Sequence, residues 1–132
     1  MAATAALVEQ VRASVVRASS AALDELAAAL PAPITSISMR TWPSDFPRDL
    51  EVQLRSPWEA RADAVMYRQV LAEIASSHGW EIRPYEAKTI VGEAEASLGD
   101  RADDVLRGPR TRLGPPWTKD HVTALAATVA LG

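Results

Sequence analysis

The chain has 132 residues, of which 48% are hydrophobic and 23% are charged, with a net charge of −3. This composition is typical of one folded domain with a single core and excludes a disordered or fibrous protein. The negative net charge disfavours coating of nucleic acid or anionic membrane over the whole surface, because such binding needs a positive field. Cysteine is absent, which excludes disulfides and thiolate zinc sites, and a metal site built from His78 and His121 alone is disfavoured.

Residues 2–30 are rich in alanine, and Val8, Val11 and Val15 recur at three- and four-residue steps. This spacing predicts one long helix that ends at Pro31. Acidic residues interrupt the segment, so we interpret it as mature structure rather than a leader peptide. No apolar run reaches the 18 residues or so that a membrane span requires, and a cytoplasmic location is expected.

Two alternating segments follow the first helix. Residues 34–41 place apolar and polar side chains on opposite faces, as in a strand. Residues 42–48 contain Pro43, Asp45 and Pro47, which favour a turn. Residues 50–54 alternate again and predict a second strand, most simply the hairpin partner of the first.

The next segment carries signals for the start and end of a helix. Ser56 and Glu59 have the spacing of a capping box, which predicts a helix over 57–78. Gly79 is suited to close this helix with a left-handed conformation. Trp80 and Ile82 share a face of a predicted strand over 80–85.

The C-terminal part is predicted to be mainly helical. A helix is expected over 89–98 and one further turn over 103–106, which Gly108 and Pro109 would stop. We therefore interpret 107–117 as a loop.

A last helix over 118–131 completes the order helix, strand, strand, helix, strand, helix, helix. This order predicts an α/β fold in one small domain, with helices packed on a sheet of three or so strands. The long first helix would cover an edge of that sheet or pair with a second copy.

The sequence Tyr85-Glu86-Ala87-Lys88 directly follows the predicted strand over 80–85. In carboxylate nuclease sites, a Glu-x-Lys at a strand end places the carboxylate on a divalent cation and the ammonium near the attacking water. Such a site also needs an Asp from a neighbouring strand, for which Asp45 and Asp49 are the nearby candidates. The alternative interpretation is a solvated strand end before a helix.

The segment before the last helix concentrates positive charge. Arg107, Arg110, Arg112 and Lys119 are accompanied by Trp117, and no acidic residue lies among them. Arginine binds phosphate oxygens in a bidentate manner, a Trp ring can stack on a base, and the following helix start adds partial positive charge. In the alternative interpretation, the arginines pair with the acidic residues at 100, 103 and 104, and the tryptophan is a hydrophobic plug.

Asp120 and His121 open the last helix. The functional hypothesis is a metal-bound Asp120 with His121 as acid, base or ligand. The structural alternative is an acidic residue stabilised by the helix dipole.

From Arg61 onward, these features resemble the C-terminal half of RuvC-type Holliday-junction resolvases. The shared features are an alanine-rich helix, a strand ending in Tyr85, a helix after it, and a final helix that opens with Lys119-Asp120-His121. The resemblance covers about half of the chain and implies an RNase H-like fold in which Asp120 is a metal ligand, with His121 beside it. That family begins with a strand bearing a metal-binding Asp, whereas this chain begins with a helix, and residues 34–41 lack the further catalytic Glu. The resemblance therefore supports a fold more than an activity.

Three hypotheses of function follow. The first is a small RNase H-like domain that binds nucleic acid or another phosphate-bearing partner through the basic segment, with an incomplete nuclease site. The second is a non-catalytic assembly protein that dimerises through residues 2–30. The third is a hydrolase dependent on Mg or Mn, with catalytic residues Glu86, Lys88, Asp120 and His121, in which Glu86 and Asp120 converge within about 4–6 Å around one cation.

Overall fold

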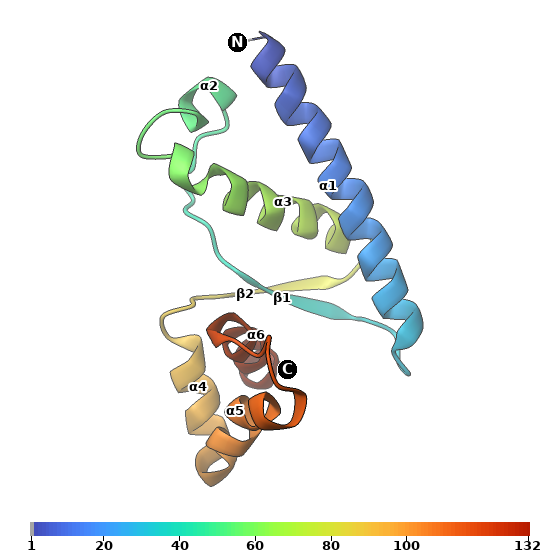
Figure 1. The fold of residues 1–132 in the computed structure, drawn as a ribbon, viewed down its shortest axis with the longest axis vertical. Helices are drawn as coiled ribbons and strands as arrows, with labels where there is room; N and C mark the ends of the chain where they lie inside the picture. The colour runs from blue at the N-terminus through green and yellow to red at the C-terminus, as the bar shows by residue number, and fades with distance from the viewer. Residues whose placement is uncertain (1) are drawn as a thin grey trace. The chain divides into compact units, whose positions relative to one another are not determined.

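The computed structural model describes residues 2–132 and shows a mixed α/β chain that is mostly helical (Figure 1). The chain divides into two compact units. The first unit consists of the chain up to Ile37 together with Trp42–Ile82, and the second consists of Ser38–Thr41 together with Arg83–Gly132. Each unit is described below by itself.

In the first unit, the long helix α1 (Ala2–Ala29) packs against α3 (Ala62–Ser77). This confirms the predicted N-terminal helix, whose end agrees with the proline at position 31. Arg12 of α1 forms an ion pair with Glu73 of α3. The buried face of α3 has helical spacing and consists of Val65, Val70, Ile74 and Ala75. No helix within residues 2–132 combines the length and the apolar character that crossing a membrane demands.

The predicted strand over 50–54 was wrong, because this segment forms the short helix α2 (Leu50–Gln53). Asp49 caps this helix, and its Oδ1 accepts a hydrogen bond from the backbone N–H of Glu51 at 2.8 Å. A strand needs a neighbour for its backbone groups, and the strand over 36–40 pairs with a later strand instead. Asp49 therefore has a local structural role.

The sheet among residues 2–132 has two parallel strands, β1 (Ser36–Arg40) and β2 (Glu81–Tyr85). This confirms strands within 34–41 and 80–85 but not the expected third strand. The backbone N–H of Glu81 donates to the carbonyl of Thr35 at 2.9 Å, and that of Thr41 donates to the carbonyl of Tyr85 at 3.1 Å. Parallel strands require a crossover connection, which here contains α2 and α3.

The helix α3 begins later than predicted. Residues Glu59–Arg61 form a 3-10 turn, and the N-cap of α3 is Arg61, which makes no side-chain capping bond. The expected capping box of Ser56 and Glu59 is therefore not the start of this helix. Gly79 closes α3 with a φ of +74°, as predicted.

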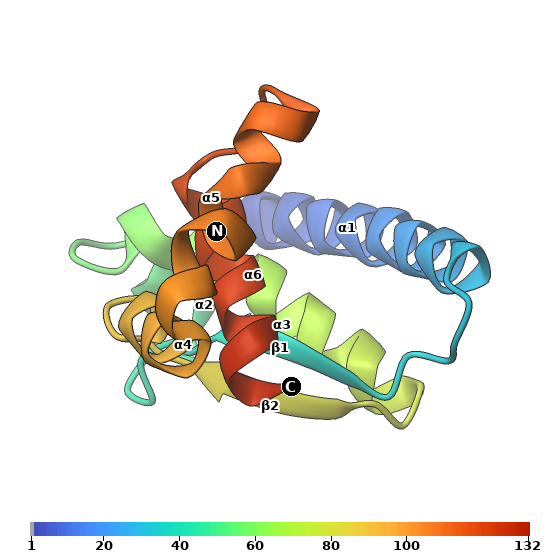
Figure 2. The same ribbon diagram turned by 90° about the horizontal axis from the view of Figure 1, so that it is seen from below.

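The second unit contains three α-helices, α4 (Ile90–Leu98), α5 (Ala102–Leu113) and α6 (Lys119–Leu131). Helix α4 packs closely against α6, and α5 contacts both (Figures 1 and 2). Leu106 of α5 is fully buried in one cluster with Ala94 and Ala126. The surrounding apolar residues are Val91, Leu98, Val122, Leu125, Val129 and Ala130. The predicted helices over 89–98 and 118–131 are thus confirmed.

The predicted loop over 107–117 is confirmed only for residues 114–117, because α5 continues through Pro109 to Leu113. Acidic residues occupy its first turn and arginines its last, which is the favourable arrangement relative to the helix dipole. Asp103 lies 3.6 Å from Arg107, four residues along the same helix. Gly114, with a φ of +68°, ends the helix instead of Gly108.

Candidate phosphate-binding site

A cavity of about 680 Å³ lies within the second unit, where residues just before α4 meet α5 and the start of α6. We call it the basic cavity. Its lining residues are Ala87, Lys88, Val91, Arg107, Arg110, Trp117, Thr118, Lys119, Val122 and Thr123. Four of them are cationic and none is acidic, so the lining carries only positive charge. The structure thereby brings together Lys88 and most of the basic segment that the sequence singled out.

Three of the four cations are available to a ligand. Arg107 is 3.3 Å from Glu95 and 3.6 Å from Asp103, so its charge is already compensated. Lys88, Arg110 and Lys119 have no ion-pair partner within residues 2–132, and all three side chains are exposed. The basic cavity therefore carries about three uncompensated positive charges.

Trp117 is a fixed aromatic wall of the basic cavity. Its Nε1 donates a hydrogen bond to the backbone carbonyl of Leu106 at 3.1 Å. Its ring lies against the imidazole of His121, with 5.4 Å between the ring centroids and a tilt of 33°. The residue is half-buried, which leaves part of the ring accessible. These contacts hold the indole in one orientation.

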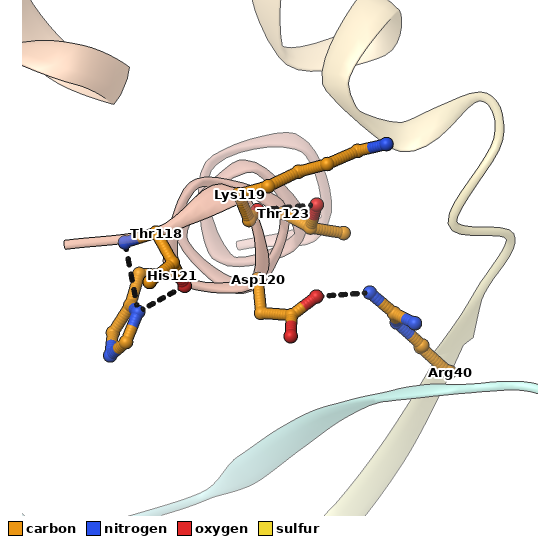
Figure 3. Close-up of polar contacts among 6 residues, drawn as sticks. All are labelled: Arg40, Thr118, Lys119, Asp120, His121 and Thr123. Atoms are coloured by element: carbon orange, nitrogen blue, oxygen red, sulfur yellow. Dashed lines mark hydrogen bonds and ion pairs between the residues drawn. The ribbon is translucent and has the colours of Figure 1, made fainter. Parts of the chain in front are cut away.

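At the start of α6, neighbouring side chains point in different directions (Figure 3). Lys119 lines the basic cavity, whereas Asp120 points in another direction and pairs with Arg40 at 3.2 Å. His121 Nδ1 accepts the backbone N–H of Thr118 at 3.2 Å, so this imidazole caps the helix. Neither Asp120 nor His121 lines the basic cavity.

The structure does not assemble the expected metal site. Glu86 accepts a hydrogen bond from Thr41 Oγ1 at 3.0 Å and lines a separate cavity of about 300 Å³ that Lys88 does not line. Asp120 lines neither cavity and is paired with Arg40. Within residues 2–132, no group of three or more histidines and carboxylates is arranged to hold a metal ion. The expected convergence of Glu86 and Asp120 around one cation is therefore not seen, because the two carboxylates have different partners.

Arg112 also differs from the expectation. It does not line the basic cavity and lies 3.6 Å from Asp104, which is one of the ion pairs that the sequence left open as an alternative. The apolar lining residues Ala87 and Val91 were not identified from the sequence as part of a binding site. The available signal was the three-residue spacing of Lys88 and Val91, at the point where the predicted helix over 89–98 begins.

Comparisons with protein families, with curated proteins and with solved structures find no match for this chain. The function is therefore argued from the geometry and charge of the basic cavity.

Proposed function

We propose that this protein binds a phosphate-bearing ligand, a nucleic acid or a nucleotide, in the basic cavity. The observation that carries the proposal is the absence of acidic residues from a lining that holds four cations and one fixed tryptophan. An anion that enters the cavity meets uncompensated positive charge without facing a repelling carboxylate. Charge-assisted hydrogen bonds to such an anion are about twice as strong as neutral ones.

The kinds of donor in the lining favour phosphate. Arg110 offers a planar guanidinium that matches two oxygens at once, whereas Lys88 and Lys119 provide point charges. Lys119 is the first residue of α6, where the backbone N–H groups add partial positive charge. The lining contains no carboxylate or imidazole, so it supports binding by charge and shape rather than general base catalysis. The proposal does not depend on the RNase H-like resemblance of residues 61–132.

Replacement of Arg110 by alanine tests the proposal directly. We expect Arg110→Ala to weaken binding of inorganic pyrophosphate at least about tenfold, because one charge-assisted contact contributes roughly 1.5–3 kcal/mol. Pyrophosphate binding would be followed by NMR spectroscopy, in a titration at low ionic strength. The resonance of the Trp117 indole N–H should shift as the ligand binds. Because salt screens the attraction between the cations of the cavity and the anion, the affinity for pyrophosphate should fall as the salt concentration is raised.

Arg112→Ala is the matched control, since Arg112 lies on the same helix but outside the basic cavity and paired with Asp104. This variant should bind pyrophosphate with an affinity within about twofold of that of the unmodified protein. Equal losses in both variants would show that net charge rather than this cavity attracts the anion. Failure of pyrophosphate and of a single-stranded oligonucleotide to bind at low salt would remove the proposal altogether.

Self-association through α1 is a second candidate function. Although α1 packs on α3, its side chains Leu7, Val11 and Leu26 remain 60%, 46% and 49% exposed. Leu7 and Val11 also line an apolar groove of about 200 Å³ with residues of α2 and α3. Exposed apolar side chains gathered in this way are typical of interaction sites. A second copy offers the same groove and the same protruding side chains, as a two-fold interface requires.

The double variant Leu7→Glu with Val11→Glu tests this candidate. Because both side chains are about half exposed, the fold should tolerate the change while a dimer interface should not. We expect sedimentation to show a dimer for the unmodified protein and a monomer for the variant, with the same circular dichroism. A monomeric unmodified protein at high concentration would contradict this candidate and leave the phosphate proposal unaffected.

A further inference from the structure

The basic cavity has two chemically different parts. Lys88, Arg110 and Lys119 supply positive charge, whereas Ala87, Val91 and Val122 supply apolar surface, and Trp117 adds an aromatic wall. An inorganic anion would use only the charged part. A ligand that fills both parts must join an anionic group to a flat or apolar body. The volume of about 680 Å³ is within the usual range of about 300–1,000 Å³ for small-molecule sites.

The charge of the lining indicates the size of the anionic group. Because Arg107 is compensated by Glu95 and Asp103, three cations remain for the ligand. A terminal phosphate carries a charge of about −1.5 to −2 near neutral pH, and each phosphate esterified on both sides adds about −1. Two linked phosphates therefore match three cations better than a single phosphate does.

The aromatic wall indicates the other part of the ligand. Trp117 is held by its hydrogen bond to the Leu106 carbonyl and by the His121 ring, so stacking on it requires little further ordering of the side chain. A base stacked on an aromatic side chain is a sequence-tolerant contact, because every base has a flat aromatic face. The apolar side chains Val91 and Val122 would pack against the edge of such a base or its sugar.

We infer that the ligand of the basic cavity is a nucleoside diphosphate, with its two phosphates at the lysines and Arg110 and its base against Trp117. This inference rests on the proposed function and names the substrate class of the same site. It distinguishes a single nucleotide that enters one cavity from a polynucleotide that needs contacts along a groove.

Calorimetric titration of the full chain tests the inference. The ligands are the diphosphates of adenosine, guanosine, cytidine and uridine, with adenosine monophosphate, inorganic pyrophosphate and a 12-nucleotide single-stranded DNA for comparison. We expect at least one nucleoside diphosphate to bind about tenfold more tightly than either pyrophosphate or the monophosphate. Trp117→Ala should reduce the affinity for that diphosphate to the level of pyrophosphate, while the affinity for pyrophosphate itself stays within about twofold.

Trp117→Phe keeps a stacking surface and should retain most of the diphosphate affinity, which separates stacking from loss of the fold. Pyrophosphate that binds as tightly as every diphosphate would overturn the inference but leave the proposed function standing. A single-stranded DNA that binds more tightly than every diphosphate would also overturn it, in favour of a polynucleotide. Absence of binding by all of these ligands would end both proposals.

Discussion

The start of α6 shows how adjacent residues acquire separate roles. Lys119, Asp120 and His121 lie on one helical turn, where successive side chains are about 100° apart around the axis. Lys119 therefore lines the basic cavity, Asp120 reaches Arg40 of β1, and His121 turns back to the backbone of Thr118. Proximity in sequence suggested that Asp120 and His121 share a metal site, but helical rotation directs these two side chains to different partners.

The capping role of His121 leads to a prediction about stability. His121→Ala removes the acceptor for the Thr118 N–H and should lower the free energy of unfolding by about 1 kcal/mol, as loss of a helix cap usually does. His121→Glu restores the usual capping-box side chain and should recover this loss. Thermal melts of both variants would measure the effect. If glutamate fails to rescue while pyrophosphate binding collapses in both variants, the imidazole belongs to the binding site instead.

At the scale of elements, α5 is the segment whose helical state creates the basic cavity. In a loop, Arg107 and Arg110 would have no fixed relation to each other, whereas on a helix their three-residue spacing places both near one face. The helix tolerates Gly108 and Pro109 because Leu106 is fully buried and because acids and arginines at opposite ends complement the dipole. The burial of Leu106 and the charges at the two ends of α5 together outweigh the cost of a proline inside a helix, which is about 3 kcal/mol.

Pro109 should therefore be a site where α5 can be stabilised. We expect Pro109→Ala to raise the free energy of unfolding by at least about 1 kcal/mol, because it restores a backbone hydrogen-bond donor and relieves the clash with the preceding turn. Urea denaturation would measure the change. Pro33→Ala, outside any helix, is the control and should be neutral or slightly destabilising. A loss of stability in Pro109→Ala would show that packing of the half-buried ring matters more than the helix.

At the scale of the whole chain, each of the two units has buried residues of its own. Val65, Val70 and Ala75 are buried in the first unit, and Leu106, Ala94 and Ala126 are buried in the second. The basic cavity is lined entirely by the second unit, and the exposed apolar groove entirely by the first. The two candidate functions therefore belong to different units and can be removed separately.

Leu106→Ala tests whether the units unfold independently. Leu106 is fully buried, and removal of such a side chain costs about 2–5 kcal/mol. We expect hydrogen exchange to accelerate at the amides of α4, α5 and α6, with little change in α3. Val70→Ala, fully buried in the first unit, should give the reverse pattern. Equal acceleration in both units would show one cooperative fold instead.

The sequence by itself determined the elements that depend on local patterns. The long first helix, the two strands, the last helix and the glycine that ends α3 follow from apolar spacing and from residues that break or cap a helix. It also singled out Lys88 in the Glu-x-Lys motif and, as a separate basic segment, the cations at 107, 110, 112 and 119 with the tryptophan at 117. These features are local, so short windows of sequence contain them.

Only the tertiary structure decided which of these residues share a cavity. Residues 50–54 alternate like a strand, but strand formation needs a partner, and β1 pairs with β2 instead. Glu86 accepts a hydrogen bond from Thr41, and Asp120 forms an ion pair with Arg40, both at the end of β1. The two carboxylates therefore do not bind a common cation. Partners distant in sequence determine such contacts, because the free energy of a buried face or an ion pair depends on what the fold places opposite it.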